Sequence, residues 1–318
     1  MLHPLSRRRT TARFVLFFWL CAASAPSFAQ QWDTTYVQEQ TARYRINGGF
    51  RVIDDLAEFT TPDGERFEIE NRNLAFRIGG RYGIASYTFS IPISDLGTGT
   101  DEEQSGGWGL GLRLYRRYGY FRTQFRFTDG FRLTKNNGDG EFRSDIKLFT
   151  AYVYAYHLLN ARRFSLRSSF NQRDRQLVSS GSFLLGGLIT RRRFLADSLA
   201  ISQEEGASLQ LARFAQTNLG VGGGYSYTAI INKDFFITPL IYAGPELRFT
   251  NVQESGRGRM AENVRVGLQL RARLSVGYNV GRYFVALIGD FIPNTDKTAT
   301  LTTRSSRSQL ELRIGTQW

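Results

Sequence analysis

Residues 264–278 alternate between apolar and polar side chains with little interruption. Val264, Val266 and Leu268 stand at even positions, whereas Arg271 and Arg273 stand at odd ones. Successive side chains of a β-strand point to opposite faces, so this stretch predicts a ribbon with one apolar and one polar face. Such a ribbon is typical of the wall of a bacterial outer-membrane β-barrel, in which lipid covers one face and the lumen lies on the other.

Eleven further stretches show alternation, although one of them is aromatic on both faces and its phase is left open (146–158). The eleven are residues 44–52, 74–78, 87–93, 108–114, 121–127, 146–158, 164–171, 219–227, 237–249, 283–291 and 310–318. With the first stretch they predict an all-β chain, a transmembrane antiparallel up-and-down β-barrel of about 12 strands.

The joints between these stretches support the same topology. Outer-membrane barrels have short periplasmic turns and long outer loops, and an even strand number places both termini in the periplasm. Short and long joints alternate here, the short ones near Tyr82, Arg117, Ala161, Lys233 and Gly281 and the long ones near Asp63, Gly99, Asn137, Ile189, Gly256 and Lys297.

Two features complicate the barrel. Segment 174–213 is long for one outer loop, and Ser182–Ile189 is apolar enough to add strand, so 14 strands are possible; an infolded loop or plug is the other option. Pro239 and Pro245 fall in one predicted strand, although a closed barrel has no edge strand to accommodate proline. We expect a bulge at Gly244–Pro245.

The N-terminal residues predict export. Arg7, Arg8 and Arg9 precede an apolar run, and Ser27 and Ala29 place small residues where a signal peptidase reads the chain. We expect a secretory signal peptide over residues 1–29, Sec-dependent export, and an outer-membrane β-barrel domain over residues 30–318. No apolar run of the length of a membrane-spanning helix follows the signal.

The polar face of the predicted strands is rich in arginine, in a chain of formal net charge +13 at pH 7. Arginine stays charged at any working pH, its planar fork suits carboxylate and phosphate, and rings of basic side chains favour anions in pores. Glu246, Asp290 and Glu311 are the inward acids that the alternation places. The arginines expected to face inward are Arg45, Arg51, Arg77, Arg113, Arg122, Arg126, Arg167, Arg173, Arg248, Arg265, Arg271, Arg273 and Arg313.

Three functions fit this interior. The first is passage or binding of small anionic solutes, and the second is a non-conducting structural or surface-interaction barrel in which the arginines pack against lumen acids and carbonyls. A distant third is an outer-membrane lipid hydrolase, which the single mature histidine, His157, disfavours because it lies near a periplasmic turn. We expect no enzyme, no cofactor, no metal site and no nucleic-acid partner.

Other partners are expected from the surface of the barrel. A strand that ends on the aromatic residue Trp318 resembles the signal read by the outer-membrane insertion machinery. Outer-membrane lipids are expected around the wall, with an interfacial aromatic girdle at the short-turn ends. The residues assigned to this girdle are Tyr82, Tyr115, Tyr118, Tyr120, Phe235, Tyr278, Tyr283 and Trp318. Arg191, Arg192 and Arg193, expected in the long outer connection, are either a solvated charge run or a site for lipid phosphates.

The stretch from Asn160 to Ser165, together with Phe170–Gln172 and Ser179–Phe183, is similar to the middle of the Bacteroidota domain-of-unknown-function family 4421. The resemblance implies an exported β-barrel without an assigned activity, cofactor or catalytic residue. It draws attention to polar residues that either tie an infolded loop or form a ligand site: Arg163, Arg167, Asn171, Gln172, Arg173, Gln176 and Ser182.

Overall fold

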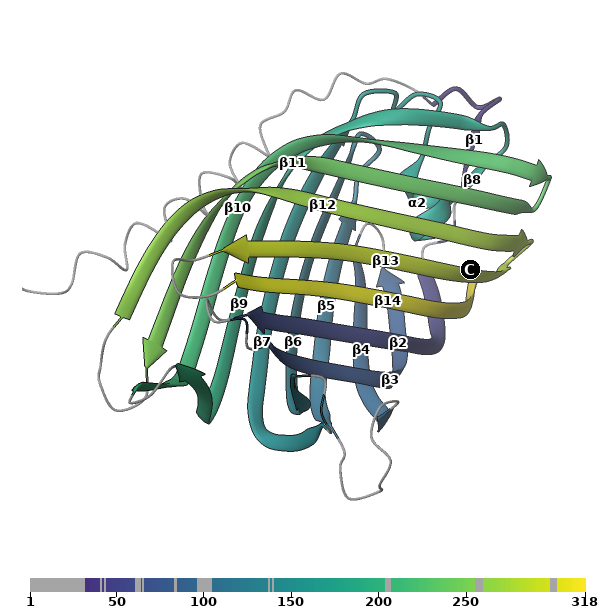
Figure 1. Ribbon diagram of the computed structural model, residues 1–318. Helices are drawn as coiled ribbons and strands as arrows, with labels where there is room; N and C mark the ends of the chain where they lie inside the picture. Colours follow the sequence, from purple (N-terminus) through teal and green to yellow (C-terminus); the bar gives the residue numbers. More distant parts are fainter. Residues whose placement is uncertain are drawn as a thin grey trace, which may run out of the picture. The chain divides into compact units, whose positions relative to one another are not determined.

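The alternating stretches form twelve antiparallel strands that close into a barrel (Figure 1). The computed structural model describes residues 32–318 apart from 41, 43, 61–63, 65, 83–84, 96–104, 137, 139, 204–206, 255–259 and 298–301. The signal peptide predicted over residues 1–29 lies outside the described residues. Within them, the strands of the barrel are β2 (Tyr44–Thr60), β3 (Arg66–Tyr82), β4 (Ala85–Asp95), β5 (Gly106–Tyr115), β6 (Gly119–Lys135), β7 (Glu141–Leu158), β9 (Ser180–Gln203), β10 (Ala207–Asn232), β11 (Phe235–Glu254), β12 (Met260–Val280), β13 (Tyr283–Lys297) and β14 (Thr302–Gln317).

Consecutive strands are neighbours in the barrel. β7 pairs with β9 across an inserted segment, and β14 pairs with β2 to close the ring. The closed antiparallel up-and-down barrel of 12 strands that the alternation predicted is confirmed.

Side chains sort by parity along the strands. Ile46 and Phe50 on β2 are 52% and 48% exposed on the outside, whereas Arg45 and Arg51 are 3% and 2% exposed and face the interior. The outer surface is therefore apolar and the guanidinium groups are enclosed. A barrel surrounded by lipid requires this arrangement.

The predicted number of strands is confirmed, but two segments of the chain were assigned wrongly. Residues 164–171 were predicted as a wall strand but contain a short helix, α2 (Leu166–Phe170), which is buried on all sides. The strand that replaces it is β9, which was expected to lie in a long outer loop centred on Ile189; β9 instead runs to Gln203, and β10 begins at Ala207. Because α2 is buried on every side, its apolar and polar residues do not follow the period of a helix. Alternation alone therefore could not distinguish it from a strand.

An inserted segment, residues 159–179, turns into the end of the barrel that carries both termini. It contains α2 and β8 (Asp174–Gln176), and β8 pairs with β1 (Val37–Glu39) of the N-terminal segment. We call residues 33–39 and 159–179 the plug. The short turn expected near Ala161 is wrong, because this joint is long and folds inward. Among the described residues, no helix is long and apolar enough to cross a membrane.

The prolines of β11 do not cause the expected bulge. The ladder between β11 and β12 runs without a register shift from Phe235 to Gln253. The ladder between β11 and β10 instead skips positions next to Pro239 and Pro245. Each proline therefore lacks its N–H group on the side that faces β10. One hydrogen bond between β10 and β11 is lost at each proline, and no extra residue is inserted into the strand.

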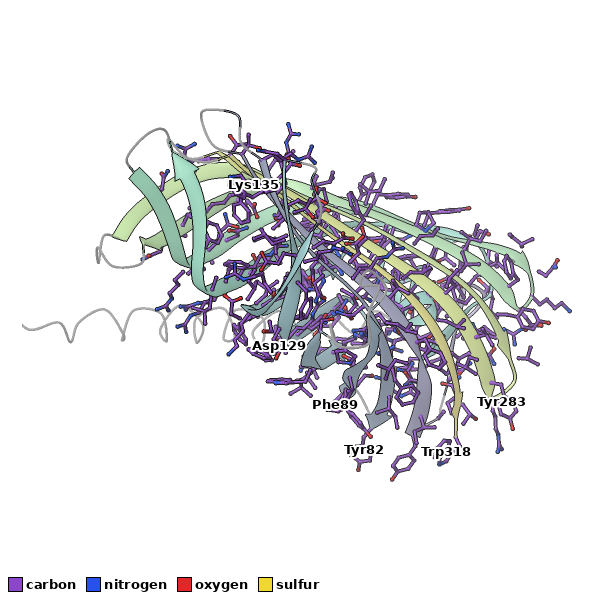
Figure 2. All side chains as sticks on the ribbon, turned by 60° about the horizontal axis from the view of Figure 1, so that its bottom comes forward. Tyr82, Phe89, Asp129, Lys135, Tyr283 and Trp318 are labelled. Carbon is purple, nitrogen blue, oxygen red and sulfur yellow. The ribbon has the colours of Figure 1, made fainter. Side chains whose placement is uncertain are left out.

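Fewer strands form the ring at the end opposite Tyr44 and Trp318. β4 and β5 are shorter than their neighbours, and beyond them β3 pairs directly with β6, with Phe67–Glu70 facing Arg132–Lys135. Figure 2 shows Lys135 near this end and Tyr82, Tyr283 and Trp318 gathered at the other.

Those three aromatic side chains are exposed on the outside of the barrel, as a girdle requires. Tyr115 and Tyr120, which were assigned to the same girdle, are buried inside the barrel instead. They follow the inward parity of Arg113 and Arg122.

Candidate functional site: an arginine-lined, plugged lumen

Arginine dominates the interior of the barrel. The carboxylates that meet these arginines there are fewer: Asp55, Asp174, Glu246, Asp290 and Glu311. Positive charge therefore exceeds negative charge among the described interior residues. The thirteen buried arginines are Arg45, Arg51, Arg77, Arg81, Arg113, Arg122, Arg126, Arg167, Arg248, Arg271, Arg273, Arg307 and Arg313.

Glu311 on β14 binds arginines from three adjacent strands. Its carboxylate accepts hydrogen bonds from Arg51 of β2 (3.2 Å), from Arg77 of β3 and from Arg313 of β14 (2.7 Å). All four side chains are almost fully enclosed. One acid thus serves three cations, and two positive charges remain in excess at this cluster.

Asp290 on β13 forms a second cluster. Arg271 bonds to both of its carboxylate oxygens, one at 2.9 Å, while Arg122 and Arg273 approach to 3.7 and 4.0 Å. The guanidinium of Arg271 also lies over the ring of Tyr154, 4.3 Å from its centroid. This cluster joins β6, β7, β12 and β13 across the lumen.

Two interior acids were missed by the sequence analysis. Asp55 pairs with Arg126 and lies 3.7 Å from Arg307. It was missed because β2 extends beyond the predicted stretch 44–52. Asp174 belongs to the plug, which was not predicted to enter the barrel. Extending the predicted stretch 44–52 to residue 55 would have placed Asp55 inside the barrel. No local sequence pattern places Asp174 there.

Four arginines form one row around half of the barrel. The register of the strands places Arg45, Arg81, Ser86, Arg113 and Arg122 opposite one another in succession on β2, β3, β4, β5 and β6. All five side chains are buried. We call the four arginines the arginine row. Like charges placed directly opposite each other in a sheet repel, so this row needs compensation.

The arginines of the row differ in the contacts that offset their positive charge. Arg81 donates to the carbonyl of Ala42 (2.6 Å), and Arg45 lies over the ring of Phe284 at 5.5 Å. Arg113 is 2% exposed, and its Nε and Nη1 atoms have no hydrogen-bond partner among the described residues. A buried charge without a counter-charge costs several kcal/mol. Arg113 therefore marks the place where an anion would be most stabilising.

The plug is built around Arg167. Its guanidinium donates two bonds to Asp174 (2.7 and 2.5 Å) and one to Glu39 of β1 (2.9 Å). Gln176 accepts from the backbone N–H of Ser165 (3.1 Å) and donates to the carbonyl of Arg163 (2.6 Å). These bonds join β1, α2 and β8, the elements of the plug, to one another.

Further bonds join the plug to the barrel wall. Arg313 of β14 donates to the carbonyl of Phe170 (3.0 Å), and Ser275 of β12 donates to the carbonyl of Ser169 (2.9 Å). Asn171 is bonded to Ser86 at 3.3 Å, beside Arg113. The C-terminal end of α2 is therefore held at Ser86, which lies between Arg81 and Arg113 of the arginine row.

The structure brings together only part of the predicted candidate set. Arg113, Arg122, Arg126, Arg248, Arg271, Arg273 and Arg313 are buried in the wall. Asn171 and Gln172, just after α2, bond to Ser86 and Arg313 of the wall. Arg167, Arg173 and Gln176 belong to the plug and not to the wall. Arg163 is exposed and Arg265 is half-buried. Ser182 accepts from the backbone N–H of Asn160 (2.9 Å), so it holds a turn of the inserted segment.

An exposed contact joins the N-terminal part of the plug to the inserted segment. The carboxylate of Asp33 accepts from Thr35 and from Arg163 (3.3 Å). The hydrogen bonds from Thr35, and then the contact with Arg163, hold the pKa of Asp33 below its ordinary value against the effect of desolvation.

The basic run Arg191–Arg193 lies in β9 and not in a loop. Its members alternate: Arg192 faces the lumen and donates to Ser305 (2.7 Å), while Arg191 and Arg193 face outward. Arg213 of β10 joins them on the outer surface, next to the pairs Thr217–Arg191 and Ala215–Arg193. The outward three form a basic patch in the described part of the wall.

Hydrolytic and metal chemistry find little support among the described residues. His157 is exposed, and its nearest ring contact is Tyr118 at 6.1 Å. No group of three or more His, Cys, Asp and Glu side chains comes together there in a way that could hold a metal ion.

Solved structures similar to this chain are bacterial barrels. The outer membrane protease OmpT from Escherichia coli is 9% identical with a TM-score of 0.46, covering 86% of this chain and 96% of its own. The translocator domain of the autotransporter NalP from Neisseria meningitidis is 9% identical with a TM-score of 0.37, covering 96% and 99%. The β domain of the Bordetella autotransporter BrkA is 10% identical with a TM-score of 0.37, covering 84% and 98%.

The resemblance in the middle of the chain extends over nearly all of it. None of the curated proteins matches this sequence. The model of one family, described as a domain of unknown function (DUF4421), matches residues 31–315. The chain therefore belongs to the DUF4421 family.

Proposed function

We propose that this chain is a bacterial outer-membrane barrel that binds a small anion, a phosphate or a carboxylate, in its arginine-lined lumen. The observation that carries the proposal is Arg113, a buried guanidinium in a row of four arginines; its Nε and Nη1 atoms have no hydrogen-bond partner among the described residues. A bound anion would supply the missing counter-charge and hydrogen-bond acceptors. Guanidinium groups bind carboxylate and phosphate in a bidentate manner.

Binding is better supported than free passage. The plug occupies the end of the lumen that carries the termini, and both α2 and the wall contribute hydrogen bonds that hold it there. Passage of a solute requires the plug to move. The alternative function, a non-conducting structural barrel, is supported by the ion pairs of Glu311, Asp290 and Asp55, which stabilise the wall without any ligand.

An outer-membrane location follows from the two surfaces of the wall. A continuous apolar exterior around an ionic interior is stable in a bilayer and unfavourable in water. We infer export by the Sec pathway, lipid contacts around the wall and recognition of the C-terminal strand by the insertion machinery. The basic patch of Arg191, Arg193 and Arg213 is placed to meet lipid phosphates.

Thermal unfolding of the purified barrel in detergent tests anion binding. Phosphate is titrated at constant ionic strength, with HEPES as the bulky compensating anion. Because a ligand that binds the folded state stabilises it by mass action, the midpoint should rise with phosphate concentration. In Arg113→Met the midpoint without phosphate should be higher than in wild type, and the phosphate dependence should be lost. Arg163→Met, which removes an exposed arginine, is the matched control.

The outcomes separate the two functions. A phosphate-dependent rise in wild type and in Arg163→Met, absent in Arg113→Met, supports an anion site. Equal midpoints at all phosphate concentrations in all three proteins would leave the structural barrel as the function.

A further inference from the structure

The barrel wall is open between β12 and β13 over part of its height. The two strands pair from Val280–Tyr283 to Ala272–Phe291, and their ladder ends there. β12 continues to Met260 beside β11, and β13 continues to Lys297 beside β14. Figure 1 shows β12 extending beyond the end of β13 and bending away from it. We call the unpaired edges, residues 260–271 and 292–297, the seam.

Pro293 explains why the ladder ends at this point. In the register of β12 and β13, Arg271–Ile292 would follow Ala272–Phe291, and the next pair of the same hydrogen-bonding type would be Leu270–Pro293. Residues two apart on a strand direct their N–H and C=O groups to the same neighbour, so Pro293 faces β12 as Phe291 does. Proline has no N–H group for the carbonyl of Leu270. The β13–β14 ladder continues past Pro293 because that residue does not bond in that direction.

The open edge lies on the apolar, outward-facing part of the wall. Val266 and Leu268 are 76% and 65% exposed, against 46% for Leu274 on the paired part of the same strand. One carbonyl of the open edge, that of Leu268, accepts from Arg248 at 3.0 Å. Unsatisfied backbone groups are costly in hydrocarbon, so the seam favours an occupant that carries hydrogen-bonding groups.

A cavity lies directly behind the seam and is lined from both of its sides. Leu270 and Arg271 contribute from β12, and Ile292 and Pro293 from β13. Its enclosed volume is about 30 Å³, and about 480 Å³ when the open space around it is counted. The far wall consists of tyrosine and aliphatic side chains, Tyr152, Tyr154, Tyr156, Leu188 and Tyr242.

The lining of this cavity is amphipathic. Tyr152, Tyr154 and Tyr156 stack along β7, with ring centroids 5.9 and 6.4 Å apart, and present an apolar surface with polar edges. Two guanidinium groups, Arg192 and Arg271, and one carboxylate, Glu246, also line it, so the cationic side chains outnumber the acid. A tail would contact the rings and aliphatic groups, and an anionic head would contact the guanidinium groups.

The plug occupies one end of the barrel. Toward the other end, Phe59, Phe131, Phe194 and Phe214 line a second cavity, which shares Tyr152 and Arg192 with the first. The seam is the most direct lateral route to the first cavity, because residues of both seam edges line it.

We propose that the seam is a lateral portal through which an anionic, single-chain amphiphile enters the lumen from the membrane. Its head group binds Arg192 and Arg271, and its tail lies along the tyrosines of β7 toward the opening. A strand of another protein could also pair with the open edge of β12. The amphiphile is favoured because a pairing strand has no use for a cavity lined by tyrosine and arginine behind the edge.

Binding of a dansyl-labelled undecanoate to the barrel in lipid nanodiscs tests the portal, with laurate as competitor and empty nanodiscs as background. The double variant Leu270→Cys/Pro293→Cys closes the seam when oxidised, because these residues would face each other two positions beyond the last pair of the ladder. The chain has no cysteine after Cys21 to interfere. Val276→Cys/Leu287→Cys, a pair within the existing ladder, is the matched control.

Oxidation of the seam pair should weaken laurate binding at least tenfold, and reduction should restore it, with no change in the control pair. Leu188→Trp, which fills the cavity, should cause the same loss even where the seam disulfide fails to form. Arg192→Met should weaken binding of laurate but not of methyl laurate. Equal binding in both redox states and in Leu188→Trp overturns the portal. A seam disulfide that leaves laurate binding intact but releases an associated chain, seen as a lower mass, assigns the seam to a partner strand instead.

Discussion

The side-chain amide of Gln269 donates a hydrogen bond to the carbonyl of Val221 at 3.0 Å, across the strand that separates them. The register of β10 and β11 places Val221 opposite Pro245, which has no N–H group to donate. Gln269 on β12 thus replaces the missing hydrogen bond from inside the lumen. This contact explains how a proline persists in the middle of a closed wall.

Gln269→Leu should therefore destabilise the barrel by about 1–3 kcal/mol, the cost of leaving a buried carbonyl without a donor. Urea unfolding of the protein in detergent measures the change. Gln38→Leu makes the same substitution at an exposed position of β1 and should leave stability nearly unchanged. Equal stability of the two variants would mean that Val221 finds another donor.

Glu311→Gln should be among the most destabilising single substitutions in the wall. It leaves Arg51, Arg77 and Arg313 without their shared carboxylate, and breaking a buried ion pair costs roughly 3–5 kcal/mol. Unfolding by urea gives the magnitude. Adding Arg77→Met should recover part of the loss, because one uncompensated charge is removed. Glu141→Gln, at an exposed position, controls for the loss of one negative charge.

Arg167→Met should loosen the plug and create conductance. Removing this guanidinium leaves Asp174 buried without a counter-charge and releases Glu39 of β1. We expect wild type to show no sustained conductance in planar bilayers and Arg167→Met to show channels that prefer anions, because the arginine row would then line an open path. Arg162→Met, exposed on the same segment, should behave as wild type. Silent membranes with Arg167→Met would show that other bonds suffice to hold the plug.

Acid should weaken the attachment of the N-terminal segment. The pKa of Asp33 is lower in the folded protein than in the unfolded chain, so its contribution is present above the ordinary carboxyl pKa and is lost as the pH falls through the folded value. The fluorescence of the neighbouring Trp32 should report a transition below pH about 3.8, the ordinary pKa. Asp33→Asn should lack it. An identical transition in that variant would assign the signal to another carboxylate.

Trp318→Ala should reduce the amount of barrel in the membrane more than it reduces stability. Trp318 exchanges backbone hydrogen bonds with Tyr44 (2.9 and 3.1 Å) and stacks on its ring at 6.4 Å, where the last strand meets the first. The truncated side chain leaves the backbone bonds intact. Quantification of folded protein in outer membranes, beside refolding in detergent, separates insertion from stability. Trp108→Ala, on the outer face of β5, is the control, and an equal loss in both variants would argue against a terminal signal.

The barrel could be predicted from the sequence because parity is a local property. Ile46 and Arg45 differ by one position and face opposite sides wherever the strand lies, so a period of 2 identifies the strand and its two faces. The inward parity of Arg113, Arg122 and Arg313 follows in the same way. Aromatic residues on both faces of β7 hid its phase, since burial of Tyr152 and Tyr154 inside the lumen breaks the usual rule of a polar interior.

The partners of these side chains could not be predicted, because they depend on which strands meet. Glu311 and Arg77 are far apart in the sequence and meet only because β14, β2 and β3 close the ring. The plug was hidden for a related reason: α2 is enclosed by the wall on every side, so its sequence shows no amphipathic period.

Alternation along the chain thus determined the strands, their two faces and the arginine content of the enclosed side. The tertiary structure alone decided that residues 164–171 lie in the plug, that β9 takes their place in the wall, and that β12 and β13 separate at Pro293. Strand closure and the end of a ladder are long-range events, set by the register of distant segments, and a pattern of period 2 carries no information about register.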